Sequence, residues 1–451
     1  MNGPKIAVVG GGLAGLAAAI ECADGGADVT LYEARQRLGG ATFSVDRKGH
    51  WIDNGQHILL RCCVSYGSFL NRLGVERLVA MQPRLAIPVL REGHKPALLA
   101  RAQLPAPLHL VSALLGYTPL RVRERFAALR AGAALRRLDP DDPELDLATF
   151  GDWLRAHGQS PRAIASLWNL IALPTMNVPA DEASLAQAVQ VFRTGLLDSA
   201  GACDIGVSTV PLQQLHGDAA AAVLAEAGAR VLLGTPVRSI ERELGSLRVN
   251  LDDGAEAVHA VIAAVPHSAA GDLLPPGAVD TDALAGLGEG PIVNLHVHYD
   301  RRVLGHQIAA AVDSPVQWLF DRTTASGIDT GQLVVVSLSD ARTEIGESVA
   351  VLRERYLPAL ARLLPAAAAA EVLDFTVTHE PHATFRPVPG TRRLRPGERT
   401  EVPGVYLAGA WTNTGWPATM EGAVRSGVLA AHAALSDLVV GPTAREEVLA
   451  S

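Results

Sequence analysis

Three glycines near the start of the chain have the spacing of a phosphate-binding turn. Gly10, Gly12 and Gly15 form a G-x-G-x-x-G sequence directly after the apolar residues 6–9. Gly10 permits a tight turn, Gly12 lets backbone N–H groups approach a pyrophosphate, and Gly15 lets a helix pack closely on the preceding strand. Glu33 follows at the distance at which a carboxylate accepts hydrogen bonds from an adenosine ribose. Together these residues predict a dinucleotide-binding site.

The elements that position this turn follow from the apolar pattern around it. Residues 5–9 and 28–33 have the pattern of strands and residues 13–25 that of a helix, which predicts a β-α-β start and a parallel sheet. Further elements of the same style are expected later in the chain. They are strands at 228–237, 246–251, 257–265 and 405–409, a turn at 252–254 and a helix at 421–436.

Two long segments differ in character from this pattern. Residues 81–204 are interrupted by proline and rich in helix-forming residues, while 291–298 and 332–339 have the pattern of strands and 346–372 that of a helix. We therefore predict an α/β fold, in which a Rossmann-like cofactor domain is discontinuous and an α+β substrate-binding domain is inserted into it. The predicted cofactor domain comprises residues 1–80, 205–285 and 386–440, and the predicted substrate-binding domain comprises residues 81–204 and 286–385.

The composition excludes several classes of protein. The chain has 451 residues, of which 48% are hydrophobic, so it can bury a large core and is not expected to be disordered. A formal charge of −8 argues against binding to nucleic acid, which requires a basic surface. The four cysteines have neither metal-ligand nor disulfide-framework spacing, so we expect no metal and reduced thiols. The N-terminus lacks the order of a signal peptide, and we expect a cytoplasmic protein.

The segment that follows the second strand distinguishes between cofactors. Residues 33–40, E-A-R-Q-R-L-G-G, resemble the E-A-R-x-x-x-G-G continuation of the flavin amine oxidase and phytoene desaturase superfamily. Residues 407–427 resemble its closing motif, where a helix N-terminus meets the flavin. Residues 235–237 resemble its adenine-contacting segment, and 263–266 its strand end beneath the ring system. The resemblance implies FAD, bound non-covalently because no cysteine follows Cys203.

Two departures from the superfamily pattern concern the cofactor. The superfamily commonly has arginine after the Gly39-Gly40 pair, where this chain has Ala41, and an acidic residue after Gly409, where this chain has Ala410. Each departure removes a charged contact to FAD, so we expect weaker FAD retention. The FAD-binding residues that the resemblance implies are Gly10, Gly12, Leu13, Ala14, Gly15, Glu33, Ala34, Arg35, Gly39, Gly40, Val237, Gly409, Ala410, Thr419, Met420, Glu421 and Ala423.

Residues 51–57 narrow the resemblance to one branch. Their sequence, W-I-D-N-G-Q-H, resembles the D-N-G-Q-H motif of the squalene-associated FAD-dependent desaturases, now understood as hydroxysqualene dehydroxylases, and residues 314–321 and 415–422 agree in style. The resemblance implies a bacterial enzyme of hopanoid or squalene biosynthesis that removes the allylic hydroxyl of hydroxysqualene with reduced FAD. It also implies a hydrophobic isoprenoid substrate, NAD(P)H as an external reductant, and functional association with squalene-pathway synthases.

The implied reaction requires an acid at the leaving hydroxyl and a pocket that excludes water. The candidate catalytic residues are His57, Asp53 and Glu421. Histidine is attractive because it titrates close to the working pH. The alternative is that Asp53 fixes a loop, that His57 is a structural histidine, and that Glu421 stabilises a helix N-terminus.

Three other functions stay open from the sequence. A carotenoid-type desaturase shares the cofactor and a polyene substrate but removes hydrogen. A flavin amine oxidase would need a polar or aromatic cage for the amine, which an aromatic content of 4% makes less favourable. A catalytically weak, flavin-bound scaffold protein is suggested by Ala41 and Ala410.

The last feature of the sequence is an uncharged segment, residues 102–120, that is followed directly by a basic segment, residues 121–137. Residues 102–120 carry no charge and contain Pro105, Pro107 and Pro119, which disfavours a transmembrane helix. Residues 121–137 contain six arginines and one glutamate with helical apolar spacing. Together, residues 102–137 could dock on anionic lipid at the inner face of the cytoplasmic membrane, where an isoprenoid substrate dissolves. The alternative is a lid over the substrate tunnel with a solvated basic face.

Overall fold

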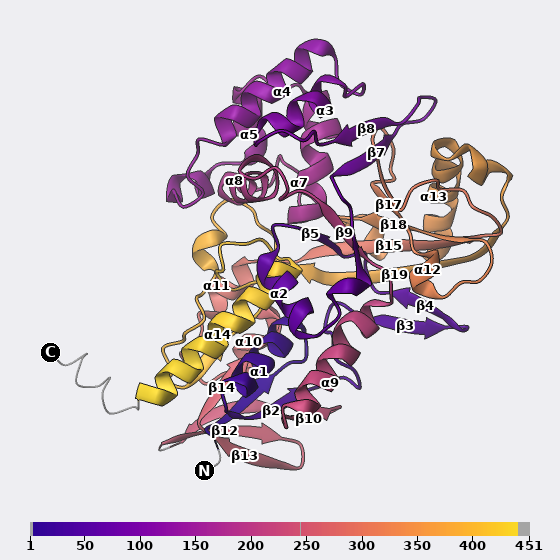
Figure 1. The fold of residues 1–451 in the computed structure, drawn as a ribbon. Coiled ribbons are helices and arrows are strands. Elements are labelled where there is room, and N and C mark those ends of the chain that lie inside the picture. The colour runs from indigo at the N-terminus through magenta and orange to yellow at the C-terminus, as the bar shows by residue number, and fades with distance from the viewer. Residues whose placement is uncertain (1–2, 244, 441–451) are drawn as a thin grey trace.

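One layer of the molecule is a parallel sheet that brings together residues far apart in the sequence. In this computed structural model, which describes residues 3–243 and 245–440, the strand order is β10-β2-β1-β14-β20 (Figure 1). The predicted β-α-β start is confirmed, because β1 and β2 pair in parallel and are connected by helix α1. These elements are β1 (Lys5–Val9), α1 (Leu13–Asp24), β2 (Asp28–Glu33), β10 (Arg230–Leu233), β14 (Ala260–Ala263) and β20 (Val405–Leu407).

Helix α14 (Met420–Val440) packs directly on α1, so a segment from the end of the chain completes the layer begun at its start. A Cβ atom on Gly427 would lie 2.1 Å from the carbonyl oxygen of Ala14 and 3.0 Å from the backbone nitrogen of Ala18. The two helix backbones are therefore in contact, and only glycine fits at position 427.

A second sheet has seven strands in the order β19-β15-β18-β17-β16-β7-β8 and is antiparallel except where β16 pairs with β7. Its strands come from two separated parts of the chain, residues 86–100 and 290–384. The limits of the two predicted domains stay a prediction. The strands are β7 (Ala86–Leu90), β8 (Ala97–Ala100), β15 (Gly290–Tyr299), β16 (Ile308–Ala311), β17 (Trp318–Asp321), β18 (Gln332–Leu338) and β19 (Val372–Thr384).

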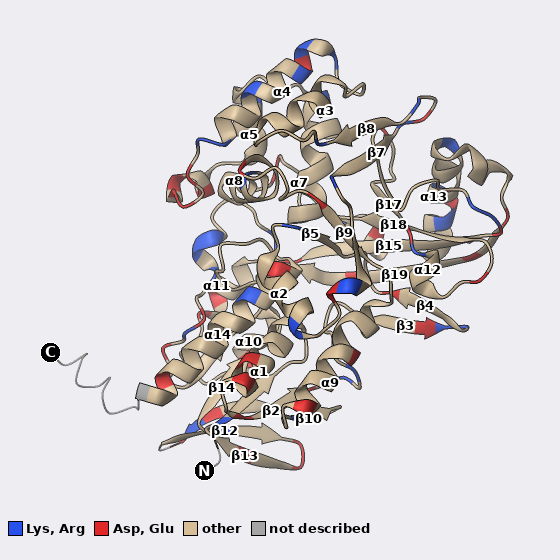
Figure 2. Cartoon of the chain, viewed as in Figure 1, with Lys and Arg blue, Asp and Glu red and all other residues tan. Residues whose placement is uncertain are grey.

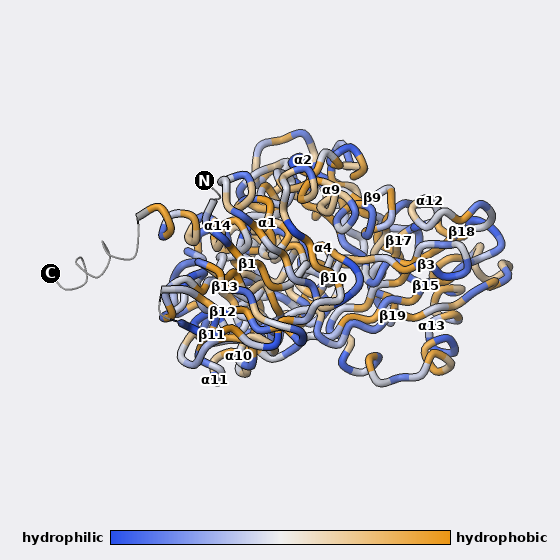
Figure 3. The backbone as a smooth tube through the Cα atoms, turned by 90° about the horizontal axis from the view of Figure 1, so that it is seen from below, coloured by the Kyte–Doolittle hydropathy of each residue, from blue (hydrophilic) through white to orange (hydrophobic). Residues whose placement is uncertain are grey.

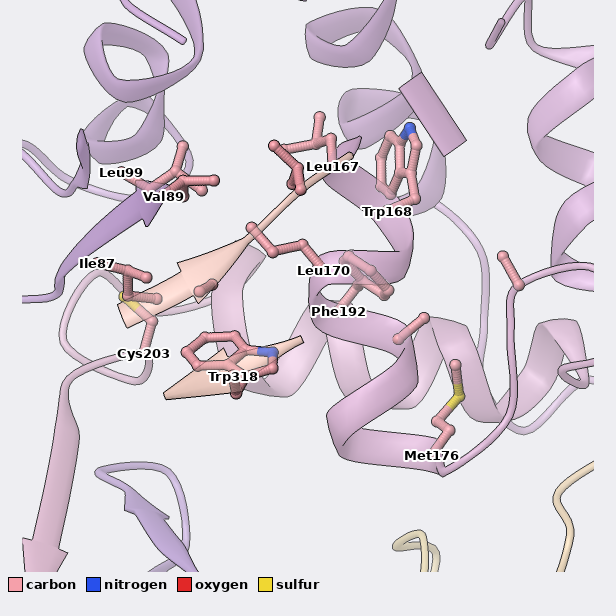
Figure 4. Packing of buried hydrophobic residues seen from close by; sticks show 14 of the residues in the cluster. Ile87, Val89, Leu99, Leu167, Trp168, Leu170, Met176, Phe192, Cys203 and Trp318 are labelled. Atoms are coloured by element: carbon pink, nitrogen blue, oxygen red, sulfur yellow. The ribbon is translucent and has the colours of Figure 1, made fainter. Parts of the chain in front are cut away.

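A group of helices lies beside β7 and β8 and contains large apolar side chains (Figure 1). Figure 4 shows Leu167 and Trp168, from the π-helical segment Ile164–Trp168, and Phe192 of α8 near Trp318 of β17. The ring centroids of Trp168 and Phe192 are 5.3 Å apart. The helix-rich character predicted for residues 81–204 is confirmed. The helices are α3 (Val111–Leu115), α4 (Val122–Leu135), α5 (Phe150–Ala156), α6 (Pro161–Ala163), α7 (Asn169–Met176) and α8 (Leu185–Phe192).

Three predicted elements are wrong in extent, and the first is the predicted strand 228–237, of which only Arg230–Leu233 (β10) is a strand. The predicted strand 257–265 is two strands that separate at His259, since β13 pairs with β12 and β14 pairs with β1 and β20. β14 is fully buried and β13 is largely exposed, so the chain must change sheet between them. The predicted helix 346–372 ends at Leu363, because Pro365 begins a separate 3-10 turn before β19.

The remaining elements connect these layers, and hydrophobic residues follow the interior strands and helices while hydrophilic ones gather in outer loops (Figure 3). None of the described helices combines the length and apolar character that a membrane span requires. The remaining helices and strands are β3 (Ser44–Arg47), β4 (His50–Asp53), β5 (Ile58–Leu60), α2 (Val64–Arg72), β6 (Val79–Met81), β9 (Ile205–Ser208), α9 (Ala219–Glu226), β11 (Ser239–Glu243), β12 (Ser246–Leu251), β13 (Gly254–Val258), α10 (His267–Leu273), α11 (Thr281–Gly286), α12 (Thr323–Ser326) and α13 (Val349–Leu363).

Candidate active site

The glycine-rich turn between β1 and α1 has no room for a side chain at two positions. Gly10 has a φ of +107°, and a Cβ atom on it would lie 2.4 Å from the Ala264 carbonyl oxygen. A Cβ atom on Gly15 would lie 1.8 Å from the Gly10 carbonyl oxygen. A Cβ atom on Gly12 would instead meet nothing closer than the Gly40 Cα at 3.7 Å. The turn is therefore tight at Gly10 and Gly15 and open at Gly12, where a pyrophosphate would approach the backbone.

Glu33, at the end of β2, is fixed beside this turn. Its Oε2 accepts a hydrogen bond from the Gly11 N–H at 2.7 Å, and its Oε1 accepts one from the Arg35 N–H at 2.8 Å. Each oxygen keeps a second lone pair for a ribose hydroxyl. The Thr235 N–H donates to the Glu33 carbonyl at 2.9 Å, so the segment that carries Val237 lies next to this carboxylate.

The loop after β2 folds back on the glycine turn. A Cβ atom on Gly40 would lie 2.6 Å from the Gly12 Cα, so the two backbones touch. The Arg37 guanidinium lies 3.2 Å above the centroid of the Phe43 ring and donates to the Gly40 carbonyl at 3.2 Å. Arg37 therefore places a positive charge in this loop, although position 41 has alanine in place of the superfamily's arginine.

The loop between β20 and α14 is held by backbone contacts. The Gly409 N–H donates to the Ser426 hydroxyl at 2.8 Å. The Arg395 guanidinium, which is almost fully buried, donates to the three successive carbonyl groups of residues 410–412. This loop, which contains Ala410, is therefore positioned by Arg395 and Ser426 without an acidic side chain at position 410.

A large apolar cavity of about 520 Å³ reaches from the helices beside β8 to the start of α14. Leu167, Trp168, Leu170, Phe192 and Trp318, drawn in Figure 4, belong to its apolar lining. Its polar wall is made by side chains from three places in the chain. We define the polar wall as Gln56, Cys62, Tyr66, Thr419 and Glu421. Other polar side chains also line the cavity, namely Thr175, Gln190, Thr194, Ser337 and Ser339.

Comparison with known proteins identifies the architecture. The sequence profile of the flavin-containing amine oxidoreductases matches residues 13–435. The chain belongs to this family. It is an FAD-dependent oxidoreductase, and both the recognised superfamily and the predicted α/β fold with an FAD-binding layer are confirmed.

Two curated relatives of this flavin-containing amine oxidoreductase carry different names. A hydroxysqualene dehydroxylase of Sinorhizobium fredii is 29% identical over 450 residues, covering 96% of this chain and 99% of the relative. A zeta-carotene desaturase of Arabidopsis thaliana is 24% identical and covers 94% of this chain and 84% of the relative.

Solved structures support the same fold. The structure of putrescine oxidase bound to putrescine superposes with a TM-score of 0.72 at 20% identity, covering 96% of this chain and 99% of the other. Cyclohexylamine oxidase of Brevibacterium oxydans superposes with a TM-score of 0.71, covering 97% of this chain and 100% of the other. At such identities the likeness concerns the fold.

Asp53, one of the three candidate acids, is paired with a buried arginine and accepts two further hydrogen bonds from the protein. Its Oδ2 lies 2.7 Å from Arg322 Nη2, and both side chains are almost completely buried. Its Oδ1 accepts from the Ser44 hydroxyl at 2.6 Å and from the Leu212 N–H at 3.1 Å. This geometry favours a structural role for Asp53, which ties β4 to β9 and β17 through Arg322.

Glu421, the second candidate, caps another helix. It is 1% exposed and accepts from the Ser65 N–H at 3.2 Å and the Tyr66 N–H at 2.8 Å, both in the first turn of α2. It also accepts from Arg425 at 2.9 Å. A carboxylate at a helix N-terminus is stabilised by the helix dipole. The arrangement favours the structural alternative given above, with Glu421 joining α14 to α2.

His57, the third candidate, is the one whose ring nitrogen is free. Its Nδ1 is buried without a partner in the protein, and burial lowers its pKa below the usual value. His57 is therefore neutral near neutral pH and can offer a hydrogen bond but little acidity. It does not line the cavity, whereas its neighbour Gln56 does.

Several buried polar atoms have no hydrogen-bond partner in the protein and could bind the flavin of FAD. They include Gln56 Nε2, His57 Nδ1, Gln213 Oε1 and Asn294 Oδ1. A Cβ atom on Gly55 would lie 3.2 Å from the His57 ring and 3.7 Å from the Asn294 amide, so two of these groups meet at that glycine. Buried polar atoms require partners. A flavin ring, which is rich in nitrogen and oxygen at one edge, would supply them, and the residues fit the cofactor.

Sequence reasoning missed a pair of side chains at the cavity. Tyr66 lies in the polar wall, and its hydroxyl is 2.7 Å from His216 Nε2. The two residues are separated by 150 positions, and neither belongs to a motif. No sequence signal could have found them.

Proposed function

We propose that this oxidoreductase removes the allylic hydroxyl of hydroxysqualene reductively to give squalene. The observation that carries the proposal is a largely apolar cavity whose polar wall adjoins the start of α14, in the motif that faces the flavin in this family. Loss of the hydroxyl leaves an allylic cation, which water would capture. A cavity lined by leucine, tryptophan and phenylalanine excludes that water.

Bound reduced FAD would supply the two electrons and one hydrogen that replace the hydroxyl. The glycine turn and Glu33 would hold its adenosine diphosphate half. The loop fixed by Arg395 and the start of α14 would hold the ring against the cavity. Hydroxysqualene, the reduced flavin anion and one proton then give squalene, oxidised FAD and water. Because Asp53 and Glu421 are committed to Arg322 and α2, neither is proposed as the acid.

Carotenoid-type desaturation is the second candidate, supported by the similarity to zeta-carotene desaturases. It uses the same type of cavity but reverses the direction of electron flow. Amine oxidation is less well supported, because the carboxylate in the polar wall, that of Glu421, already accepts three hydrogen bonds. A flavin-bound scaffold without turnover is the remaining alternative. The external reductant, expected to be NAD(P)H, and an association with squalene-pathway synthases stay predictions.

Product analysis with purified, photoreduced holoenzyme tests the proposal. Anaerobic addition of hydroxysqualene is expected to reoxidise the flavin and yield squalene in equal amount. Reduction of the oxidised enzyme by phytoene, with no reaction of hydroxysqualene, would replace the proposal by desaturation, and reduction by an amine would replace it by amine oxidation. Failure of every substrate to change the flavin spectrum would favour the scaffold.

We also propose that residues 102–137 dock the enzyme on anionic lipid. Large apolar side chains are exposed here, since Leu108 is 54%, Val122 is 63% and Phe126 is 52% exposed. Leu108 also lines the cavity, so the exposed patch and the cavity share a wall. Figure 2 marks basic residues in blue on α4, where Arg123 is exposed. Apolar side chains beside arginines match the two parts of an anionic lipid surface.

Liposome sedimentation tests the docking. Retention on anionic vesicles at low salt is expected for the wild type and should be lost in the double variant Leu108→Ser, Phe126→Ser. The matched control is Val349→Ser, Val351→Ser on α13, which removes exposed valines from a helix that contributes no residue to the cavity lining. Equal retention of both variants, or no retention of the wild type, would overturn the docking proposal.

A further inference from the structure

The Tyr66–His216 pair is a buried polar group that the chemistry described so far does not use. Tyr66 is 2% exposed and His216 is 0% exposed, and their rings are 5.8 Å apart. Tyr66 belongs to the polar wall of the cavity, whereas His216 lies behind it in the π-helical turn Gln213–Asp218. A buried polar pair lowers the stability of the folded protein unless its donors and acceptors all have hydrogen-bond partners.

Tyr66 is held from two sides. Its backbone N–H donates to Glu421 at 2.8 Å, which clamps the first turn of α2 to the first turn of α14. Its phenol oxygen meets His216 Nε2 at 2.7 Å. The phenol therefore has a fixed position relative to Thr419 and Glu421, the residues through which the closing motif reaches the cavity.

Both members of the pair are neutral near neutral pH. Burial, with His57 as a second cause, lowers the pKa of His216 to about 3, and burial raises the pKa of Tyr66 above its usual value. One proton is shared between the phenol oxygen and the imidazole nitrogen. The phenol oxygen keeps further hydrogen-bonding capacity, because a hydroxyl has one donor and two acceptor sites.

The carboxylates near the wall and the amide of Gln56 are less suited to bind an alcohol. Glu421 accepts hydrogen bonds from two backbone N–H groups and from Arg425. Asp53 is paired with Arg322 and does not line the cavity. Gln56 has a free amide group, but it lies among the unpartnered atoms that fit the flavin edge.

We propose that Tyr66, oriented by His216, binds the hydroxyl oxygen of the isoprenoid substrate. This inference rests on the proposed function and names the group that distinguishes substrate from product. The substrate has one polar atom, and Tyr66 is the tyrosine among the residues that line the largely apolar cavity. After the hydroxyl has left, the product has no partner for Tyr66, so product binding is weaker and release is favoured. Tyr66 is the substrate-binding residue here and His216 a positioning residue.

Equilibrium binding to the oxidised holoenzyme tests the assignment, because oxidised flavin does not turn the substrate over. Dissociation constants for hydroxysqualene and squalene are measured from the change in flavin absorbance. Tyr66→Phe is expected to lower the preference for hydroxysqualene by about 10-fold, the size of one hydrogen bond. The affinity for squalene should stay unchanged, which also verifies that the cavity is intact.

The matched control is Tyr117→Phe. Tyr117 is a buried tyrosine whose hydroxyl donates to the Ser166 carbonyl at 2.6 Å, and it does not line the cavity. This variant should keep the wild-type preference. His216→Gln, which retains a hydrogen-bonding group, should keep part of the preference, and His216→Leu should lose it.

Two outcomes would overturn the inference. One is a Tyr66→Phe enzyme with full flavin content and the wild-type preference. The other is a wild-type enzyme that binds hydroxysqualene and squalene equally well. If Tyr66→Phe does not fold, the same decision rests on His216→Leu against His216→Gln. The proposed function fails separately, in the product analysis, so an enzyme that forms squalene without the Tyr66 preference refutes the inference alone.

Discussion

Replacing Glu421 by glutamine separates a structural carboxylate from a catalytic acid. In the structure, this side chain accepts hydrogen bonds from two N–H groups of α2 and from Arg425. An amide has one acceptor oxygen, and its NH₂ group would face one of the backbone donors. Glu421→Gln is therefore expected to destabilise the joint between α14 and α2 while leaving the substrate chemistry in place.

The size of the effect follows from the bonds that are lost. Hydrogen bonds to a charged group contribute about 1.5–3 kcal/mol each, and because Arg425 is partly exposed we expect a loss of about 3 kcal/mol in total. For a chain of 451 residues the unfolding entropy is roughly 1 kcal/mol per kelvin, so the thermal midpoint should fall by about 3 °C. The assay is thermal unfolding of the holoenzyme, followed together with turnover and flavin content.

An exposed glutamate gives the control. Glu76→Gln changes the same functional group at a solvent-exposed position and should leave the midpoint unchanged. The reasoning would be refuted if Glu421→Gln had a wild-type midpoint and full flavin content but turnover lowered by about 100-fold or more, the size expected for a lost general acid. Glu421 would then be the acid that the sequence suggested.

Three further predictions concern the cofactor layer and the buried histidine. Gly15→Ala should fail to bind FAD, because its Cβ atom would lie 1.8 Å from the Gly10 carbonyl oxygen; reconstitution to a full flavin content would contradict this. The wild type should lose FAD on dialysis, and the double variant Ala41→Arg, Ala410→Asp should bind FAD with about 10-fold higher affinity. A wild-type flavin-to-protein ratio near one after dialysis would disprove this prediction. Since His216 has a folded-state pKa of about 3 against 6.5 for an ordinary histidine, the unfolded chain binds the extra proton between these values, and stability is lost as the pH falls below 6.5. Urea unfolding should reveal a decline of about 1.4 kcal/mol per pH unit from this group, and His216→Gln should remove it; an equal slope in both proteins would contradict the assignment.

Local patterns in the sequence predicted the cofactor layer well. Gly10, Gly15 and Glu33 have spacings set by one β-α-β unit, and within such a unit neighbours in sequence are neighbours in space. The predicted strand 257–265 failed for the opposite reason. Its apolar run is continuous, and the separation at His259 is set by β1 and β20, which lie far away in the sequence.

The candidate site was only partly predictable, because the partners of its side chains lie far away in the sequence. Asp53 and Glu421 were recognised by their motifs, but their roles depend on Arg322 and on α2, at separations of 269 and 355 residues. The Tyr66–His216 contact likewise joins two segments that have no shared pattern. Motifs identify residue types, whereas the partner that occupies a carboxylate or a phenol is determined by tertiary packing.

The contact between α1 and α14 has a consequence for how the enzyme is made. Gly427, which touches Ala14, leaves the ribosome some 400 residues after the glycine turn. Until β20 and α14 arrive, β14 is an unpaired sheet edge and one face of α1 has no cover. The two halves of the cofactor site therefore meet only after Gly427 has been synthesised. The complete FAD site therefore forms only once α14 has been made, and chains that stop before β20 would be exposed to aggregation and proteolysis.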